Sequence, residues 1–189
     1  MITYRPLPGK KTLVEPAALI PDALLEVRYA STRNAFGRAF YPFPAVFLLE
    51  PVAQRLVEAA RALRSEKLRV VLYDGYRPLS VQRAMWALRP DPRFVADPAR
   101  GSRHNRGAAV DLGLADLSGR PLAMPSGFDE FGPAAAHGGS GPGAANAARL
   151  RRALEGAGFK ALEEEWWHYH DPAAENEPLL DLPFEALRP

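Results

Sequence analysis

Hydrophobic residues recur at helical spacing in two segments of the chain. The first set follows Pro51 and consists of Val52, Leu56, Ala59, Ala60 and Leu63. The second set is Ala147, Leu150, Leu154 and Ala157. Proline is well tolerated in a first helical turn, and glycine commonly follows a last one. The pattern therefore predicts one amphipathic helix from Pro51 and another that Gly156 or Gly158 ends.

A third, shorter helix is predicted after a turn at Asp74–Pro78. Ser80 can cap its N-terminus, because a serine side chain accepts a hydrogen bond from the first turn. The positions expected to face inward are Val81, Met85, Trp86 and Leu88. Pro90 sets the end of this helix, because the residue before a proline avoids helical geometry.

Four short runs rich in β-branched, aromatic or alternating residues predict strands. They are Leu25–Tyr29, Arg69–Tyr73, Ala108–Leu114 and Glu165–His170. Alternation in the third run places Val110 and Leu112 on one face and Asp111 on the other. Helices and strands follow one another without regular βαβ units, which indicates a single α+β domain over residues 1–189.

Nineteen prolines and fifteen glycines divide the chain into short elements joined by long loops. We expect irregular structure from about Asn34 through Gly37 to Pro44, and again at 91–101. The glycine-rich segment Gly132–Gly143, which contains His137, is expected to be mobile.

Composition excludes several classes of function and of site. The 24 Lys and Arg residues nearly balance the 22 Asp and Glu residues, and neither sign forms a block, so a nucleic-acid partner is not expected. The chain has no cysteine, which excludes disulfides, thiolate nucleophiles and iron–sulfur clusters. No apolar run could span a membrane, and the first residues lack a secretory core, so we expect a cytoplasmic protein. Nothing indicates an obligate protein partner.

A metal site here must use histidines and carboxylates, and the chain has four histidines. His104 and Asp111 lie seven residues apart, so on one continuous strand they would face opposite ways. The turn ending at Gly107 must therefore rotate His104 towards Asp111. His168 would complete a three-ligand site that leaves a fourth position for water, an arrangement typical of catalytic zinc.

Zinc lowers the pKa of its bound water to about 7, and a nearby carboxylate can then accept the proton. Glu165 is the candidate base, provided that it lies before the regular part of its strand or in a bulge, because a regular strand would turn it away from His168. Arg77 is a candidate for stabilising an oxyanion, and Asp74 can orient it.

Each of these residues also has a structural interpretation. A single His or Asp at a strand end is usually a satisfied polar group, and an Asp-Gly-Tyr-Arg-Pro segment is usually only a turn. His170 shares a strand face with His168, so it could compete as a ligand or lie near the rim of the site. The co-occurrence of these features favours the catalytic interpretation.

Together, the segments DGYRP, SRHNRGAAVDL and EWWHY resemble the D-alanyl-D-alanine dipeptidases of the VanX type, zinc peptidases related to D,D-carboxypeptidases and the hedgehog domain. The resemblance implies a small antiparallel sheet flanked by helices and one Zn²⁺ per chain. It assigns His104, Asp111 and His168 as metal ligands, Glu165 as the base and Arg77 as the residue that stabilises the transition state.

Weaker similarity near the start of the chain and around residues 127–130 extends the resemblance. It implies substrate contacts at Tyr29 and Asp129, and an acidic group suits the free ammonium of a dipeptide. Ser102, beside a ligand, and Asp74, beside Arg77, complete the expected substrate-binding set. Gly113 departs from the family, which often has threonine there.

The expected function is therefore zinc-dependent hydrolysis of the small dipeptide D-alanyl-D-alanine, in cell-wall peptide recycling or in glycopeptide resistance. A carboxypeptidase or endopeptidase acting on peptidoglycan stems is the alternative within the superfamily. A zinc-containing binding module without catalysis is the alternative outside enzymes. Glu165 and Arg77 argue against that module, because binding alone needs neither.

Overall fold

The computed structural model describes residues 11–187 and contains a five-stranded sheet in the order β2-β4-β5-β7-β6. Its strands are β2 (Leu24–Leu25), β4 (Leu68–Asp74), β5 (Ala109–Asp116), β6 (Lys160–Leu162) and β7 (Glu165–His170). All neighbours in this sheet are antiparallel except β2 and β4, which run parallel. A separate two-stranded sheet pairs β1 (Leu13–Val14) with β3 (Leu48–Leu49). The α+β class is confirmed.

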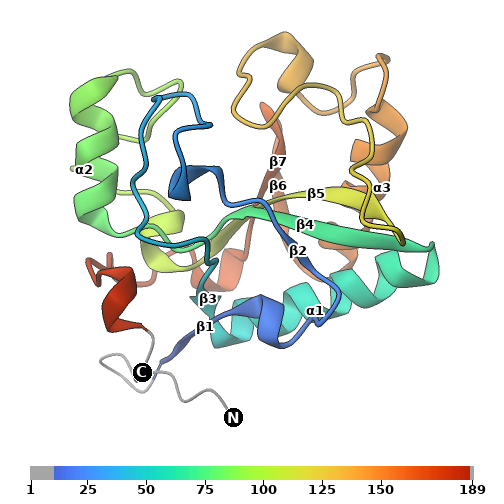
Figure 1. Cartoon of the computed structure of the whole chain (residues 1–189), viewed down its shortest axis with the longest axis horizontal. Helices are drawn as coiled ribbons and strands as arrows, with labels where there is room; N and C mark the ends of the chain where they lie inside the picture. Colours follow the sequence, from blue (N-terminus) through green and yellow to red (C-terminus); the bar gives the residue numbers. More distant parts are fainter. Residues whose placement is uncertain (1–10, 188–189) are drawn as a thin grey trace.

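Within residues 11–187 the fold has three α-helices (Figure 1). They are α1 (Glu50–Ser65), α2 (Leu79–Leu88) and α3 (Ala144–Gly156). Helices α1 and α3 pack against each other and against the sheet, whereas α2 lies on the other side of the molecule (Figure 1). The apolar stripe of α1, represented by Val52, Leu56 and Leu63, is fully buried. Burial of that stripe joins the longest helix to the sheet.

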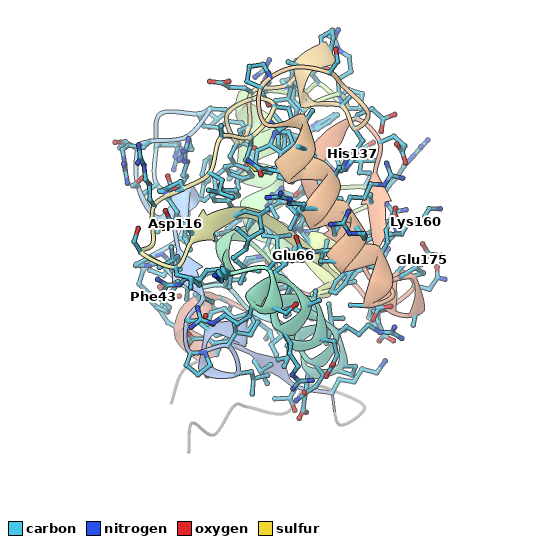
Figure 2. The ribbon with its side chains drawn as sticks, turned by 90° about the vertical axis from the view of Figure 1, so that its right-hand side faces the viewer. Phe43, Glu66, Asp116, His137, Lys160 and Glu175 are labelled. Carbon is cyan, nitrogen blue, oxygen red and sulfur yellow. The ribbon has the colours of Figure 1, made fainter. Side chains whose placement is uncertain are left out.

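The end of α1 also meets α3 through charged side chains. Figure 2 labels Glu66, just after α1, where the helix faces α3. Its carboxylate lies 3.3 Å from Arg152 and 3.9 Å from Arg149. These partly exposed pairs add little stability, so the apolar contacts between the two helices carry most of the packing energy.

The predicted helices and three of the four predicted strands are confirmed, and the differences come from tertiary contacts. The run Leu25–Tyr29 is not one strand, because Arg28–Ala30 forms a 3-10 turn. Leu25 and the amide of Glu26 still bond to β4, but the backbone carbonyl of Tyr29 accepts hydrogen bonds from the amides of Phe40 and Tyr41, so a neighbouring loop holds the second half of the run.

Helix α2 also differs in detail from its prediction. Ser80 lies inside the helix and caps nothing with its side chain. Its backbone amide instead donates to the Asp181 carboxylate at 2.7 Å, so a residue far along the chain satisfies this helix start. Met85 is buried as expected, whereas Leu88 is 51% exposed and does not face inward.

Two further expectations concern the loops and the membrane. The glycine-rich segment contains a 3-10 turn at Pro133–Ala135, and the amide of His137 donates to the Glu163 carbonyl. Its mobility stays a prediction.

Across residues 11–187, the helices are too short or too polar to span a bilayer. Most of the N-terminal segment in which no signal is expected lies outside the described residues.

Candidate active site

A cavity of about 740 Å³ brings together residues from segments far apart in the sequence. It is lined by eight of the nine predicted site residues, namely Tyr29, Arg77, Ser102, His104, Asp111, Asp129, Glu165 and His168. The ninth, Asp74, is buried and does not line the cavity. Its contact is with Arg77, which fits an orienting role and not direct contact with substrate.

Three of these side chains converge closely enough to hold a metal ion. The Nε2 atom of His104 lies 3.1 Å from Nδ1 of His168 and 3.4 Å from Oδ1 of Asp111. Nδ1 of His168 lies 3.0 Å from the same Asp111 oxygen. Asp111 and His168 are direct partners in the β5–β7 register, which places the two side chains together. Within the described residues, this is the one group of three or more potential metal ligands.

The orientation of His104 supports a ligand role. Its Nδ1 lies 2.7 Å from the Gly75 carbonyl oxygen, which can only accept, so Nδ1 carries the proton. Nε2 is therefore left with its lone pair facing Asp111 and His168. Metal-binding histidines commonly donate their second ring nitrogen in this way, and the donor set fits zinc.

Electrostatics also favour a cation between these groups. Burial alone would raise the pKa of Asp111, yet the adjacent His104 and His168 rings hold that pKa below its usual range. Burial lowers the pKa of His168, which keeps its ring neutral. Burial acts in the same direction on His104, but the charge of Asp111 outweighs it and raises that pKa. A bound metal would replace the proton that Asp111 attracts there.

Hydrogen bonds join the turn that carries Arg77 to the turn that carries His104. The amide of Arg77 donates to the His104 carbonyl at 3.1 Å, and the Asn105 side chain donates to the Arg77 carbonyl at 2.8 Å. Asn105 also accepts from the amide of Ser102, while the Ser102 hydroxyl accepts from the amide of His104. These bonds between the two turns place Arg77 beside the metal ligands.

The turn at Gly107 rotates His104 onto the Asp111 side, as predicted. His104–Arg106 form a 3-10 turn, and Gly107 ends it with a φ of 66° in the left-handed region. A Cβ at this position would lie 2.7 Å from the Leu13 side chain and 3.2 Å from the Leu49 amide. Both conformation and space therefore require glycine.

Gly107→Ala is expected to destabilise the fold by more than the roughly 1–2 kcal/mol of left-handed strain alone, because the methyl group would also clash with Leu13. Gly37→Ala is a matched control, since Gly37 has the same φ of 66° and a Cβ added there would meet nothing within 4 Å. Urea unfolding of both variants measures the difference. Equal losses of stability would show that the contact with Leu13 costs nothing.

Glu165 satisfies the geometric condition placed on it. It is the first residue of β7, and the β6–β7 register shifts between Ala161 and Leu162, so that Leu162 pairs with Glu165. This irregularity allows Glu165 and His168 to line the same cavity. Burial, with a further contribution from the Asp111 charge, raises the pKa of Glu165 to about 8.

Arg77 is held by three side-chain hydrogen bonds. Its Nε and one terminal nitrogen donate to the same Asp74 oxygen at 3.2 and 2.6 Å, and the other terminal nitrogen donates to Gln82 at 3.0 Å. Tyr41 donates to the second Asp74 oxygen at 2.6 Å. A guanidinium has five donor hydrogens, so two remain for a ligand in the cavity.

Tyr29 and Asp129 form a second polar contact at the cavity wall. The Tyr29 hydroxyl donates to the Asp129 carboxylate at 2.8 Å. Burial raises the pKa of Asp129 to about 7, which the hydrogen bond from Tyr29 only partly offsets. A cationic group placed beside this carboxylate would restore its ionised form.

The remaining histidines lie outside this centre. The His170 ring centroid lies 6.2 Å from that of His168, consistent with a shared strand face, but His170 does not line the cavity. Within the described residues, neither ring nitrogen of His170 has a hydrogen-bond partner. His137, labelled in Figure 2, packs its ring near Tyr169 and is also absent from the cavity lining.

Sequence reasoning missed three contributors to the site. The Gly75 carbonyl orients His104, and Tyr41 and Gln82 complete the support of Arg77. Gln82 had a usable signal, because it lies three residues before buried Met85 on the same helix face and is itself fully buried. Tyr41, in an irregular loop, had none.

The departure at Gly113 has a steric explanation. A Cβ at this position would lie 2.4 Å from the Tyr73 hydroxyl oxygen on the neighbouring strand β4. The side chain of Tyr73 therefore occupies the space that a threonine would need, and it stacks on Phe128 at a centroid distance of 4.7 Å.

Comparisons with known proteins identify the family of this chain. The profile of the D-ala-D-ala dipeptidase family matches residues 10–185. A D-alanyl-D-alanine dipeptidase of Escherichia coli K12 is 37% identical over 178 residues, covering 93% of this chain and 92% of the relative. One of Enterococcus faecium is 30% identical over 168 residues, covering 76% and 83%.

One solved structure, of the vancomycin resistance D,D-dipeptidase VanXYg with a D-Ala-D-Ala phosphinate analogue, is similar with a TM-score of 0.44. It is 19% identical, and the match covers 86% of this chain and 67% of the other. The family profile and the Escherichia coli relative span nearly the whole described chain. The chain belongs to the D-ala-D-ala dipeptidase family and is a metallopeptidase with a cell-wall-related function.

Proposed function

We propose that this enzyme hydrolyses D-alanyl-D-alanine to two molecules of D-alanine, using one zinc ion held by His104, Asp111 and His168. The observation that carries the proposal is the convergence of these three buried ligands in a cavity that Glu165 and Arg77 also line. When bound there, zinc would supply Lewis-acid chemistry, polarising the scissile carbonyl and lowering the pKa of water to about 7.

Glu165 is proposed as the general base. It takes a proton from the attacking water and then delivers it to the amine that leaves. A pKa near the working pH suits a group that must both accept and donate a proton. The value of about 8 reflects burial beside Asp111, and the positive charge of a metal would bring it lower.

Arg77 is proposed to stabilise the oxyanion that develops on the scissile carbonyl. Its guanidinium is held in place by Asp74 and Gln82, so its two unused donors need no reorganisation during the reaction. Both partners are buried with it, which strengthens these charge-assisted bonds.

Asp129 and Tyr29 are proposed to bind the free ammonium of the dipeptide. A substrate ammonium would ionise Asp129, whose carboxylate is otherwise held near its point of titration by burial. Ser102 lies next to the ligand His104 and completes the proposed substrate contacts.

Release of D-alanine from the free dipeptide, measured with and without a chelator, tests the proposal. An N-acylated tripeptide ending in the same pair is measured in parallel. We expect cleavage of the free dipeptide only, abolished by the chelator and restored by zinc. Cleavage of the acylated peptide would indicate a carboxypeptidase. Cleavage of neither by zinc-loaded protein would indicate another dipeptide substrate or the binding module.

A further inference from the structure

The cavity extends well beyond the space that the proposed dipeptide needs. Its volume of about 740 Å³ lies in the range of pockets that enclose drug-sized ligands, which are larger than D-alanyl-D-alanine. Besides Arg77, the wall includes five arginines, which are Arg89, Arg93, Arg100, Arg103 and Arg106. We refer to these five residues as the arginine wall.

Few carboxylates neutralise the arginine wall. Arg93 is bound by Asp91 at 2.6 Å, and Arg103 lies 3.8 Å from Glu175, a separation at the limit of an ion pair. The guanidinium of Arg89 stacks over the Phe94 ring, 3.4 Å from its centroid. Within residues 11–187, no carboxylate forms an ion pair with the Arg100 guanidinium. The wall therefore carries an excess of positive charge.

Arg106 does not reduce this excess, because its guanidinium donates to a backbone carbonyl, that of Glu177. The Glu177 carboxylate binds Lys11 instead. Glu175, labelled in Figure 2, is the one carboxylate that lines the cavity beside the arginine wall, and its side chain is 40% exposed. It is thus too well solvated to neutralise Arg103 fully.

The lining of the cavity consequently carries charged groups of both signs. Asp129 provides a carboxylate for the ammonium of a substrate. Arg100 and Arg103 lie two residues before and one residue after Ser102, whose hydroxyl accepts a hydrogen bond from the amide of the metal ligand His104, so both arginines belong to the short segment that carries this ligand. A substrate that carries both charges can place its ammonium beside Asp129 and an additional negative charge beside Arg100 and Arg103.

A simple dipeptide carries one carboxylate, whereas the arginine wall offers more than one cation. We propose that the enzyme also hydrolyses dipeptides whose second residue has an acidic side chain, and that Arg100 and Arg103 bind that side chain. This inference rests on the proposed function and deepens it. It makes D-alanyl-D-glutamate a better substrate than the neutral D-alanyl-D-glutamine, which has the same shape.

The expected preference is modest because both arginines are exposed to solvent. Partly solvated ion pairs typically change a binding equilibrium by only a few-fold each. We therefore expect kcat/KM for D-alanyl-D-glutamate to exceed that for D-alanyl-D-glutamine by about threefold to tenfold at low salt. The preference should shrink as salt rises, since exposed charges are screened.

The double variant Arg100→Gln/Arg103→Gln tests which residues carry the preference. We expect the ratio of the two kcat/KM values to fall close to one. The control, Arg61→Gln/Arg149→Gln, removes two exposed arginines of α1 and α3 that do not line the cavity. It changes the net charge by the same amount, and we expect the ratio of the two kcat/KM values to stay at the wild-type value. No preference in the wild type, or an unchanged ratio in the first variant, would overturn the proposal.

Calorimetry separates this inference from the proposed function. Zinc-loaded Glu165→Gln is titrated with the two dipeptides, because binding can then be read without turnover. Tighter binding of the glutamate peptide supports the arginine site even if no dipeptide is cleaved. Cleavage of D-alanyl-D-alanine combined with equal binding of both peptides would retain the dipeptidase and reject the arginine site.

Discussion

Glu165→Gln is expected to lower kcat for D-alanyl-D-alanine by about 10² to 10⁴-fold, the usual contribution of general acid–base catalysis. Glutamine keeps the size and the polar character of the side chain but cannot take up the proton of the attacking water. Because Glu165 is not among the three converging ligands, zinc content should stay at one ion per chain. Steady-state kinetics and metal analysis of the purified variant measure the two quantities.

Glu164→Gln is the matched control for this substitution. Glu164 is the neighbouring residue, lies in the turn before β7 and is exposed, so the same change of charge should leave kcat within about twofold. If Glu165→Gln kept wild-type activity, Glu165 would not be the general base. Loss of zinc together with activity would instead show that Glu165 helps to hold the metal.

Arg77→Lys is expected to lower kcat by about 10² to 10³-fold, comparable to removal of an oxyanion-stabilising donor elsewhere. Lysine keeps the charge, but its single ammonium cannot bind Asp74 and Gln82 and also present two donors to the cavity. The loss should fall mainly on kcat and less on KM, because the developing charge exists only in the transition state.

The corresponding control is Arg83→Lys, which makes the same chemical change on the exposed side of α2. Its kcat and its melting temperature should match those of the wild type. Arg77→Lys leaves the buried Asp74 carboxylate without its guanidinium partner. Circular dichroism of this variant checks that the turn has not unfolded as a result. A change confined to KM would reassign Arg77 to substrate binding.

The sequence alone determined the helices and three of the four expected strands, and it named nine candidate site residues, of which eight line the cavity. Helical periodicity was sufficient for α1 and α3, because each buries a regular apolar stripe. The motif residues His104, Asp111 and His168 were predictable because few histidines exist and their spacing resembles a known family. The requirement that the turn ending at Gly107 rotate His104 towards Asp111 followed from strand alternation alone.

Tertiary structure decided the features that depend on residues distant in the chain. Asp181 satisfies the start of α2, which a local capping rule assigned to Ser80. The Gly75 carbonyl selects the tautomer of His104, and Tyr41 reaches Asp74 from an irregular loop. None of these contacts has a local sequence signal, since hydrogen bonding across the fold is set by packing.

The arginine wall could not be predicted from the sequence for the same reason. Along the sequence its arginines are spread from the end of α2 through a loop to the turn after it, and the overall charge of +2 indicates nothing basic. Local patterns record which face of an element is apolar, so they determine elements and motifs. Which charges share one cavity depends on how loops pack around the sheet, and only the tertiary structure decides that.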